Sequence, residues 1–146
     1  MKLGKFTTKS QQETFDLGIR FAAELKPGNV VALFGDLGAG KTEFIKGICS
    51  YFKVDELVNS PTFTIMNQYA GVLENNEIPI LHIDLYRIKK SNELIEIGFD
   101  EIIFSSDSIK LVEWADKAFG ILPPDSYSVN IKFKKNNENE RVITID

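Results

Sequence analysis

The sequence predicts an α/β domain of three layers built around a mixed, mainly parallel sheet. A continuous apolar run at 30–34, typical of a strand buried on both faces, leads through a glycine-rich turn into a helical stretch. Further apolar runs of strand length alternate with helical patterns, and two more surround a polar turn near the end. With 146 residues and no visible linker, we expect one domain spanning residues 1–146.

The first part of the chain supplies two helices and the first buried strand. A helix is expected over Gln11–Leu25, where apolar residues recur at helical spacing, and Pro27-Gly28 ends it. Its candidate N-caps are Thr7, Thr8 and Ser10. The strand Val30–Phe34 and a helix from about Lys41 to Phe52 follow.

The middle of the chain predicts an antiparallel pair of strands. After a polar loop at Asn59–Thr62, a strand is expected from Phe63 to Tyr69. Asn75-Asn76 is a turn signal, so the apolar run Ile78–Tyr86 should return alongside that strand.

The remaining elements are short. They are a helix that Ser91 caps and Gly98 ends, a helix at Phe99–Phe104, a strand at Ile109–Val112, and a closing hairpin of Val129–Phe133 with Val142–Ile145 around a turn at Lys134–Glu140.

Charge and composition narrow the classes of function. The chain has 17 Lys and Arg against 21 Asp and Glu, a net charge of -4. A chain with this charge is a poor candidate for binding nucleic acid by itself, but it could still act on RNA as a subunit of a larger assembly. No apolar run approaches the roughly 20 residues of a membrane span. The N-terminus is too polar for a secretory signal, and Cys49, a lone cysteine expected to pack inside, fits a reducing compartment. We therefore expect a cytoplasmic protein.

The turn from Gly35 to Thr42 reads GDLGAGKT and matches the P-loop pattern G-x-x-x-x-G-K-[ST] in full. A phosphate chain needs several backbone N–H groups turned toward it, and glycine allows that turn at little steric cost. Lys41 should reach the β- and γ-phosphates, while the Thr42 hydroxyl should coordinate Mg²⁺. The sequence therefore predicts a P-loop NTPase-like fold that binds ATP or a close relative.

Two acidic residues could complete the metal site. Asp84 and Glu113 both follow apolar strands, where ligands gather at the carboxyl edge of an α/β sheet. Taken alone, each could be a solvated loop carboxylate, but beside a P-loop at least one should face the metal. Which of the two ligates Mg²⁺ directly stays open.

Other residues near these motifs have two interpretations. Ser60-Pro61-Thr62 lies where other P-loop proteins keep a γ-phosphate sensor, yet Ser-Pro is also a common turn, and the residues alone favour the turn. His82, inside a strand with apolar neighbours, is expected to be a hydrogen-bonded structural residue. Trp114 could be core or a stacking platform.

Taken together, four segments resemble the TsaE (formerly YjeE) family, small bacterial ATPases needed to make threonylcarbamoyladenosine in tRNA. They are GDLGAGKT at 35–42, SPTFT at 60–64, HIDLYR at 82–87 and VEW at 112–114. The resemblance runs from the helix at 11–18 to the final hairpin and so covers nearly the whole chain.

The resemblance implies an ATP- and Mg²⁺-dependent ATPase, slow alone and gated by partners, that associates with the TsaB and TsaD proteins. In that family TsaD transfers the threonylcarbamoyl group to adenosine 37 of ANN-decoding tRNAs, and TsaE resets the complex rather than making the base. tRNA would be met only through the complex, and no membrane is involved.

The resemblance also implies roles for residues. The catalytic residues would be Asp84, Glu113 and Lys41; the nucleotide would bind Gln11, Asp36, Leu37, Gly38, Ala39, Gly40, Lys41, Thr42 and Trp114; the metal would bind Thr42, Glu113 and Asp84; and Ser60 and Thr62 would form a switch loop. Many members have threonine where this chain has Glu43, which we expect to point outward.

Three alternatives stay open at this stage. A small P-loop kinase would need arginines to clamp phosphate, and the chain has only Arg20, Arg87 and Arg141, with no arginine-rich lid. A GTPase would need an Asn-Lys-x-Asp loop, which is absent from the sequence. A non-enzymatic assembly subunit would keep the nucleotide only as a structural ligand.

Overall fold

The structure is a computed structural model that describes residues 1–118 and 120–146. Its elements in chain order are β1 (Gly4–Thr8), α1 (Gln11–Ala22), β2 (Val30–Phe34), α2 (Lys41–Tyr51), β3 (Met66–Leu73), β4 (Asn76–Asp84), α3 (Ser91–Glu96), α4 (Phe99–Ile103), β5 (Ile109–Glu113), the 3₁₀ helix η1 (Ala115–Ala118), β6 (Tyr127–Lys134) and β7 (Asn137–Ile145).

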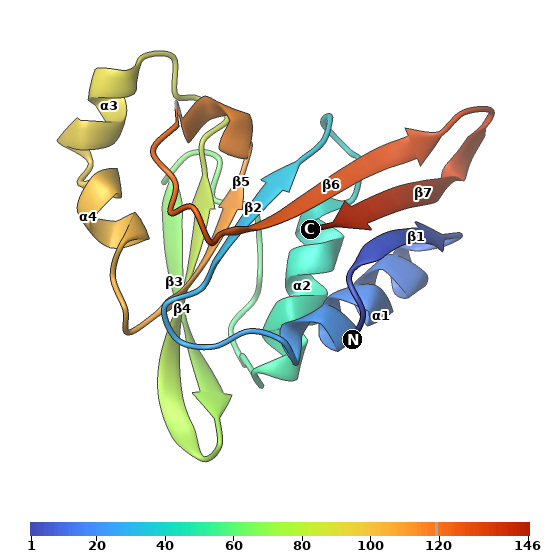
Figure 1. Cartoon of the computed structure of the whole chain (residues 1–146), viewed down its shortest axis with the longest axis horizontal. Helices are drawn as coiled ribbons and strands as arrows, with labels where there is room; N and C mark the ends of the chain where they lie inside the picture. Colours follow the sequence, from blue (N-terminus) through green and yellow to red (C-terminus); the bar gives the residue numbers. More distant parts are fainter. Residues whose placement is uncertain (119) are drawn as a thin grey trace.

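The described residues form a mixed seven-stranded sheet in the order β1-β7-β6-β2-β5-β4-β3 (Figure 1). The four central strands, β6, β2, β5 and β4, pair in parallel, while β3 at one margin and β7 and β1 at the other pair antiparallel. The predicted fold class is confirmed. Because β2 lies in the middle of the sheet, the loop that follows it opens at the centre of the carboxyl edge.

Helices cover both faces of the sheet, and each face has its own core. Val31 and Leu33 of β2 belong to the core beneath α1 and α2, whereas Val30 and Ala32 belong to the core beneath α3, α4 and η1. Successive side chains of a strand point to opposite faces, so a strand covered on both sides is apolar at every position. This explains why the run at 30–34 does not alternate.

Two glycines bring α1 and α2 into close contact. A Cβ added to Gly18 would lie 2.3 Å from the carbonyl oxygen of Phe44, and one added to Gly47 would lie 2.1 Å from that of Phe15. These distances are far below van der Waals contact, so only glycine fits at either position. The contact fixes α2, whose first turn completes the phosphate loop, against α1 (Figure 1).

The N-terminal segment differs from the prediction. Ser10 is the N-cap of α1 and accepts a hydrogen bond from the Glu13 backbone N–H at 3.1 Å. Thr7 and Thr8, which we considered as caps, lie instead in β1, a strand that the sequence did not predict. β1 pairs with β7 at the other end of the chain, so its stability comes from a partner about 135 residues away rather than from local pattern.

Both predicted hairpins form, with shifted turns. Glu74 and Asn75 have φ of 52° and 66°, the positive values that a two-residue type I′ turn requires, so the first turn lies one residue earlier than predicted. β3 begins at Met66 rather than Phe63 because the preceding residues form a turn of their own. The closing turn occupies only residues 135–136, since Lys134 already pairs with Asn137.

The short helices follow the prediction with one shift. Ser91 is the first residue of α3 and Lys90 is its N-cap, while Gly98, with φ of 74°, separates α3 from α4. In residues 1–118 and 120–146, no helix is long and apolar enough to cross a membrane.

Candidate nucleotide-binding site

The phosphate loop joins the carboxyl end of β2 to α2 and relies on glycine backbone geometry. Gly35, Gly38 and Gly40 have φ of 149°, 78° and 113°, values that side chains disfavour. A Cβ on Gly35 would also lie 2.5 Å from the carbonyl oxygen of Ile131 in β6. Gly40 is the N-cap of α2, so the free N–H groups of the first helical turn face the loop.

Lys41 lies within this loop and is almost fully buried. Its ammonium donates to the carbonyl oxygen of Gly35 and, at 2.9 Å, to that of Asp36, and it lies 4.3 Å from the centre of the Trp114 ring. Burial lowers the pKa of Lys41 below its usual value, while the charges of Glu113 and Asp84 act to raise it. The Lys41 ammonium is therefore a partly desolvated cation that experiences the charges of both carboxylates.

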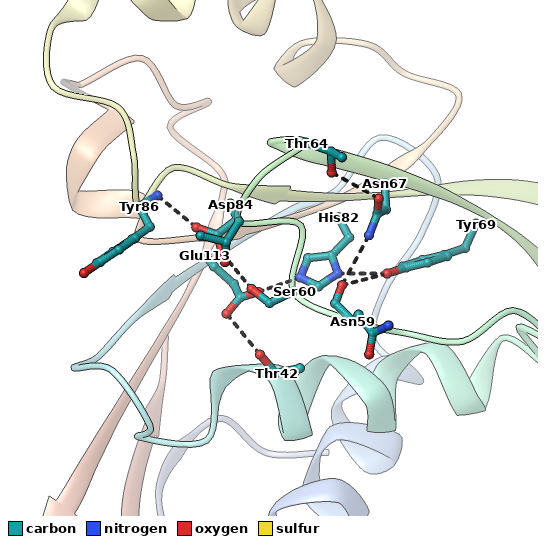
Figure 2. Close-up of polar contacts among 11 residues, drawn as sticks. Thr42, Asn59, Ser60, Thr64, Asn67, Tyr69, His82, Asp84, Tyr86 and Glu113 are labelled. Carbon is teal, nitrogen blue, oxygen red and sulfur yellow. Dashed lines mark hydrogen bonds and ion pairs between the residues drawn. The ribbon is translucent and has the colours of Figure 1, made fainter.

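Those two carboxylates end neighbouring strands. Asp84 is the last residue of β4 and Glu113 the last of β5, and the two are register partners in a parallel pair. Their exposed fractions are only 2% and 3%. The Thr42 hydroxyl donates to Glu113 Oε1 at 3.4 Å, which joins the acidic pair to the end of the phosphate loop (Figure 2).

The loop before β3 closes over the acidic pair. The Ser60 hydroxyl lies 2.6 Å from Asp84 Oδ2 and 3.1 Å from Glu113 Oε2 (Figure 2). The Thr62 hydroxyl donates to Asp84 Oδ2 at 3.2 Å. The residues alone favoured a plain turn here. The structure does have a turn at 62–64, and in addition the hydroxyls of Ser60 and Thr62 point at the candidate metal ligands.

His82 also belongs to this network, as Figure 2 shows. It is fully buried; its Nε2 lies 2.6 Å from Glu113 Oε2 and its Nδ1 lies 3.1 Å from the Tyr69 hydroxyl. That hydroxyl in turn donates to the carbonyl oxygen of Asn59 at 3.3 Å. The prediction of a hydrogen-bonded histidine is confirmed, but its contact with Glu113 was missed, although a residue two positions before Asp84 on a strand must share its face.

This donor set suits Mg²⁺. The ion prefers oxygen ligands and usually takes one or two protein carboxylates, with phosphate and water oxygens completing its shell. Thr42, Glu113 and Asp84 offer such oxygens, and two buried carboxylates side by side require a nearby cation. Within the described part of the chain, no group of three or more His, Cys, Asp or Glu side chains is placed to hold a metal.

A cavity of about 370 Å³ gathers most of the predicted site residues. It is lined by Gln11, Leu37, Gly38, Gly40, Lys41, Thr42, Glu43, Ser60, Thr62, Asp84, Tyr86, Glu113 and Trp114. Asp36 and Ala39 do not line it; they border a neighbouring hollow that shares Trp114. Glu43 was expected to point outward but lies in the cavity wall, with its Oε2 3.8 Å from Lys46 Nζ.

Comparison with known proteins agrees with this geometry. The family model described as Threonylcarbamoyl adenosine biosynthesis protein TsaE matches residues 8–143. The chain belongs to the TsaE family. A relative in Bacillus subtilis, named tRNA threonylcarbamoyladenosine biosynthesis protein TsaE, is 40% identical over 145 residues, covering 99% of this chain and 87% of its own length.

Other TsaE relatives and a solved structure extend the comparison. Proteins of the same name in Rickettsia bellii and Treponema pallidum are 39% and 31% identical, covering 84% and 94% of this chain and 82% and 96% of their own lengths. The crystal structure of Bacillus subtilis YdiB superposes with a TM-score of 0.76 at 34% identity, covering 99% of this chain and 84% of that one. The four segments that carry the TsaE resemblance each contribute to the cavity wall.

Proposed function

We propose that this TsaE-family chain binds and hydrolyses ATP with Mg²⁺ as an accessory protein of the assembly that adds the threonylcarbamoyl group to adenosine 37 of ANN-decoding tRNAs. The observation that carries the proposal is the convergence of Thr42, Glu113 and Asp84 beside a complete phosphate loop. Its proposed TsaB and TsaD partners come from the family resemblance, and the cytoplasmic location that we propose follows from the proposed work on tRNA.

The roles follow from the contacts. Lys41 would exchange its loop carbonyls for phosphate oxygens, because its ammonium already lies inside the loop. Glu113, whose Oε1 faces Thr42, would be a direct metal ligand, and Asp84, whose Oδ1 accepts from the Tyr86 N–H and whose Oδ2 accepts from Ser60, would orient the attacking water. When bound, Mg²⁺ would neutralise charge on the phosphates.

The loop hydroxyls supply the link to partners. The Ser60 hydroxyl contacts both carboxylates, so metal binding at those carboxylates would alter the position of the loop that carries Ser60. Phe63, in the same loop, is 83% exposed, and the Arg87 guanidinium lies 4.3 Å from the centre of its ring. This exposed pair offers a surface that a partner protein would bind. ATP hydrolysis would then change the partner complex rather than phosphorylate a metabolite.

A kinase receives no support from the arginines. Arg20, Arg87 and Arg141 each stack on a phenylalanine ring, and none lines the cavity in the part of the chain that the structure describes. A phosphoryl-transfer site needs such forks directed at the transferred group.

The test of nucleotide binding uses Trp114, the only tryptophan, as the reporter. Titration with ATP should change its fluorescence, Mg²⁺ should strengthen the binding, and GTP should bind more weakly. Lys41→Ala should abolish binding and Glu113→Gln should remove the Mg²⁺ effect, while Glu96→Gln, at an exposed position of α3, should behave as wild type. Equal binding by wild type and Lys41→Ala, or a clear preference for GTP, would defeat the proposal.

A further inference from the structure

The strand β7 brings an arginine to the back of the phosphate loop. Arg141 Nε donates a hydrogen bond to the carbonyl oxygen of Ala39 at 2.8 Å, across 102 positions of sequence. Ala39 is 1% exposed, so its carbonyl group needs a partner within the protein. None of the segments that carry the family resemblance includes Arg141, and sequence reasoning assigned it no role.

The geometry of the peptide bond gives this contact a consequence for the loop. In a trans peptide the carbonyl of one residue and the N–H of the next point in opposite directions. The carbonyl of Ala39 is held toward Arg141, so the N–H of Gly40 is held away from it, on the other side of the peptide plane. Gly40 has φ of 113°, and a glycine in this region can turn its peptide over at little cost. Arg141 therefore selects one of two accessible orientations.

The Nη1 end of the guanidinium is engaged in its own hairpin. Nη1 donates to the carbonyl oxygens of Glu138 and, at 3.2 Å, Glu140, and the group stacks on Phe133 at 4.0 Å. In the sheet, Arg141 pairs with Thr8 on one side and Phe133 on the other. A side chain held at so many points acts on the loop from a fixed position and is not free to swing toward a phosphate.

We propose that Arg141 is a positioning residue for nucleotide binding, which fixes the Ala39–Gly40 peptide with its N–H turned into the phosphate cradle. This inference rests on the proposed binding of ATP. A cradle N–H that is oriented before the ligand arrives adds affinity, because the ordering cost has already been met by the fold. The contribution of Arg141 to the binding free energy should be the same for every ligand that places a phosphate against that N–H.

Arg141→Met tests the claim, because methionine keeps an apolar stem but removes every donor. Trp114 fluorescence should give dissociation constants for ATP and ADP that both rise about tenfold, as expected for a lost charged hydrogen bond and a disordered peptide. The turnover number at saturating Mg²⁺-ATP should stay within about twofold of wild type. Arg141→Lys keeps one donor and should recover most of the affinity.

Arg20→Met is the matched control. Arg20 also stacks on a phenylalanine, Phe6, at 5.8 Å, but it lies on α1 and makes no contact with the loop among the hydrogen bonds of the described residues. Its substitution should leave both dissociation constants unchanged. A fall in turnover by Arg141→Met with ADP affinity intact would overturn the inference, because it would mean that Arg141 acts on the transferred phosphate itself.

A second measurement separates this inference from the proposed function. In nuclear magnetic resonance spectra of the nucleotide-free chain, Arg141→Met should shift the resonance of the Gly40 amide, and Arg141→Lys should shift it less. That result would support the positioning role even if the wild-type chain bound no ATP. An unchanged Gly40 amide in folded variants would overturn it, whatever the binding data.

Discussion

Replacing Tyr69 by phenylalanine tests whether the buried network behind Glu113 is structural, functional or both. The substitution removes one oxygen and leaves the ring, so it creates almost no cavity. The Tyr69 residue is 3% exposed, and its hydroxyl lies 3.1 Å from His82 Nδ1 and 3.3 Å from the carbonyl oxygen of Asn59. Without it, the buried His82 Nδ1 loses its partner, whereas the carbonyl oxygen of Asn59, an exposed residue, keeps a hydrogen bond from the Asn67 side-chain amide at 3.3 Å.

The expected loss of stability follows from that count. Leaving a buried polar group without a partner costs about 1–3 kcal/mol. For a chain of 146 residues, each kcal/mol lowers the melting temperature by about 2–4 °C, so Tyr69→Phe should melt roughly 3–10 °C below wild type. Tyr51→Phe is the control, because Tyr51 is 39% exposed and its hydroxyl has no hydrogen bond within the described residues. It should stay within about 0.5 kcal/mol of wild type.

The same variant should also affect the metal. His82 lies 2.6 Å from Glu113, so a histidine freed from Tyr69 no longer fixes that carboxylate. The Mg²⁺ concentration for half-maximal enhancement of ATP binding should rise several-fold, while binding without Mg²⁺ should not change. Thermal melting followed by circular dichroism and Trp114 fluorescence give the two readouts. If Tyr69→Phe matched Tyr51→Phe in both, the reasoning about this network would be refuted.

The remaining predictions concern packing, the free thiol and the loop. Gly18→Ala should cost about 2 kcal/mol or more in urea unfolding, because its Cβ would lie 2.3 Å from a backbone oxygen of α2, whereas Ser50→Ala on the exposed side of α2 should be nearly neutral. Burial raises the pKa of the Cys49 thiol to about 12, so iodoacetamide at pH 9 should label the unfolded chain far faster than the folded one; equal rates would contradict the burial. Ser60→Ala should weaken Mg²⁺-dependent ATP binding more than Mg²⁺-free binding, since the hydroxyl reaches both carboxylates and no phosphate-loop atom.

Local patterns in the sequence were enough to predict the centre of the fold. The run Val30–Phe34, the glycines after it and the helix from Lys41 are consecutive, so one stretch of chain contains both the pattern and its physical cause. Asp84 and Glu113 could be predicted to meet because both end apolar strands, and parallel strands end at the same edge.

The features that could not be predicted from the sequence depend on contacts between distant segments. β1 exists because β7 pairs with it, and Arg141 reaches Ala39 only once β6 and β7 have folded beside β2. Tyr69 meets His82 across two strands, and the register that joins them depends on where the turn lies. No local sequence pattern around these positions indicates which distant residue each one contacts.

The most direct test of the proposed function measures ATP hydrolysis and association together. The purified chain should turn over ATP slowly and only with Mg²⁺, and addition of the TsaB and TsaD pair should accelerate it. Capture of the chain by that pair should depend on ATP and should be lost in Lys41→Ala, and Glu113→Gln should abolish turnover in both settings. Association of the chain with the TsaB and TsaD pair that does not depend on ATP, or ATP hydrolysis that persists in Glu113→Gln, would contradict the account.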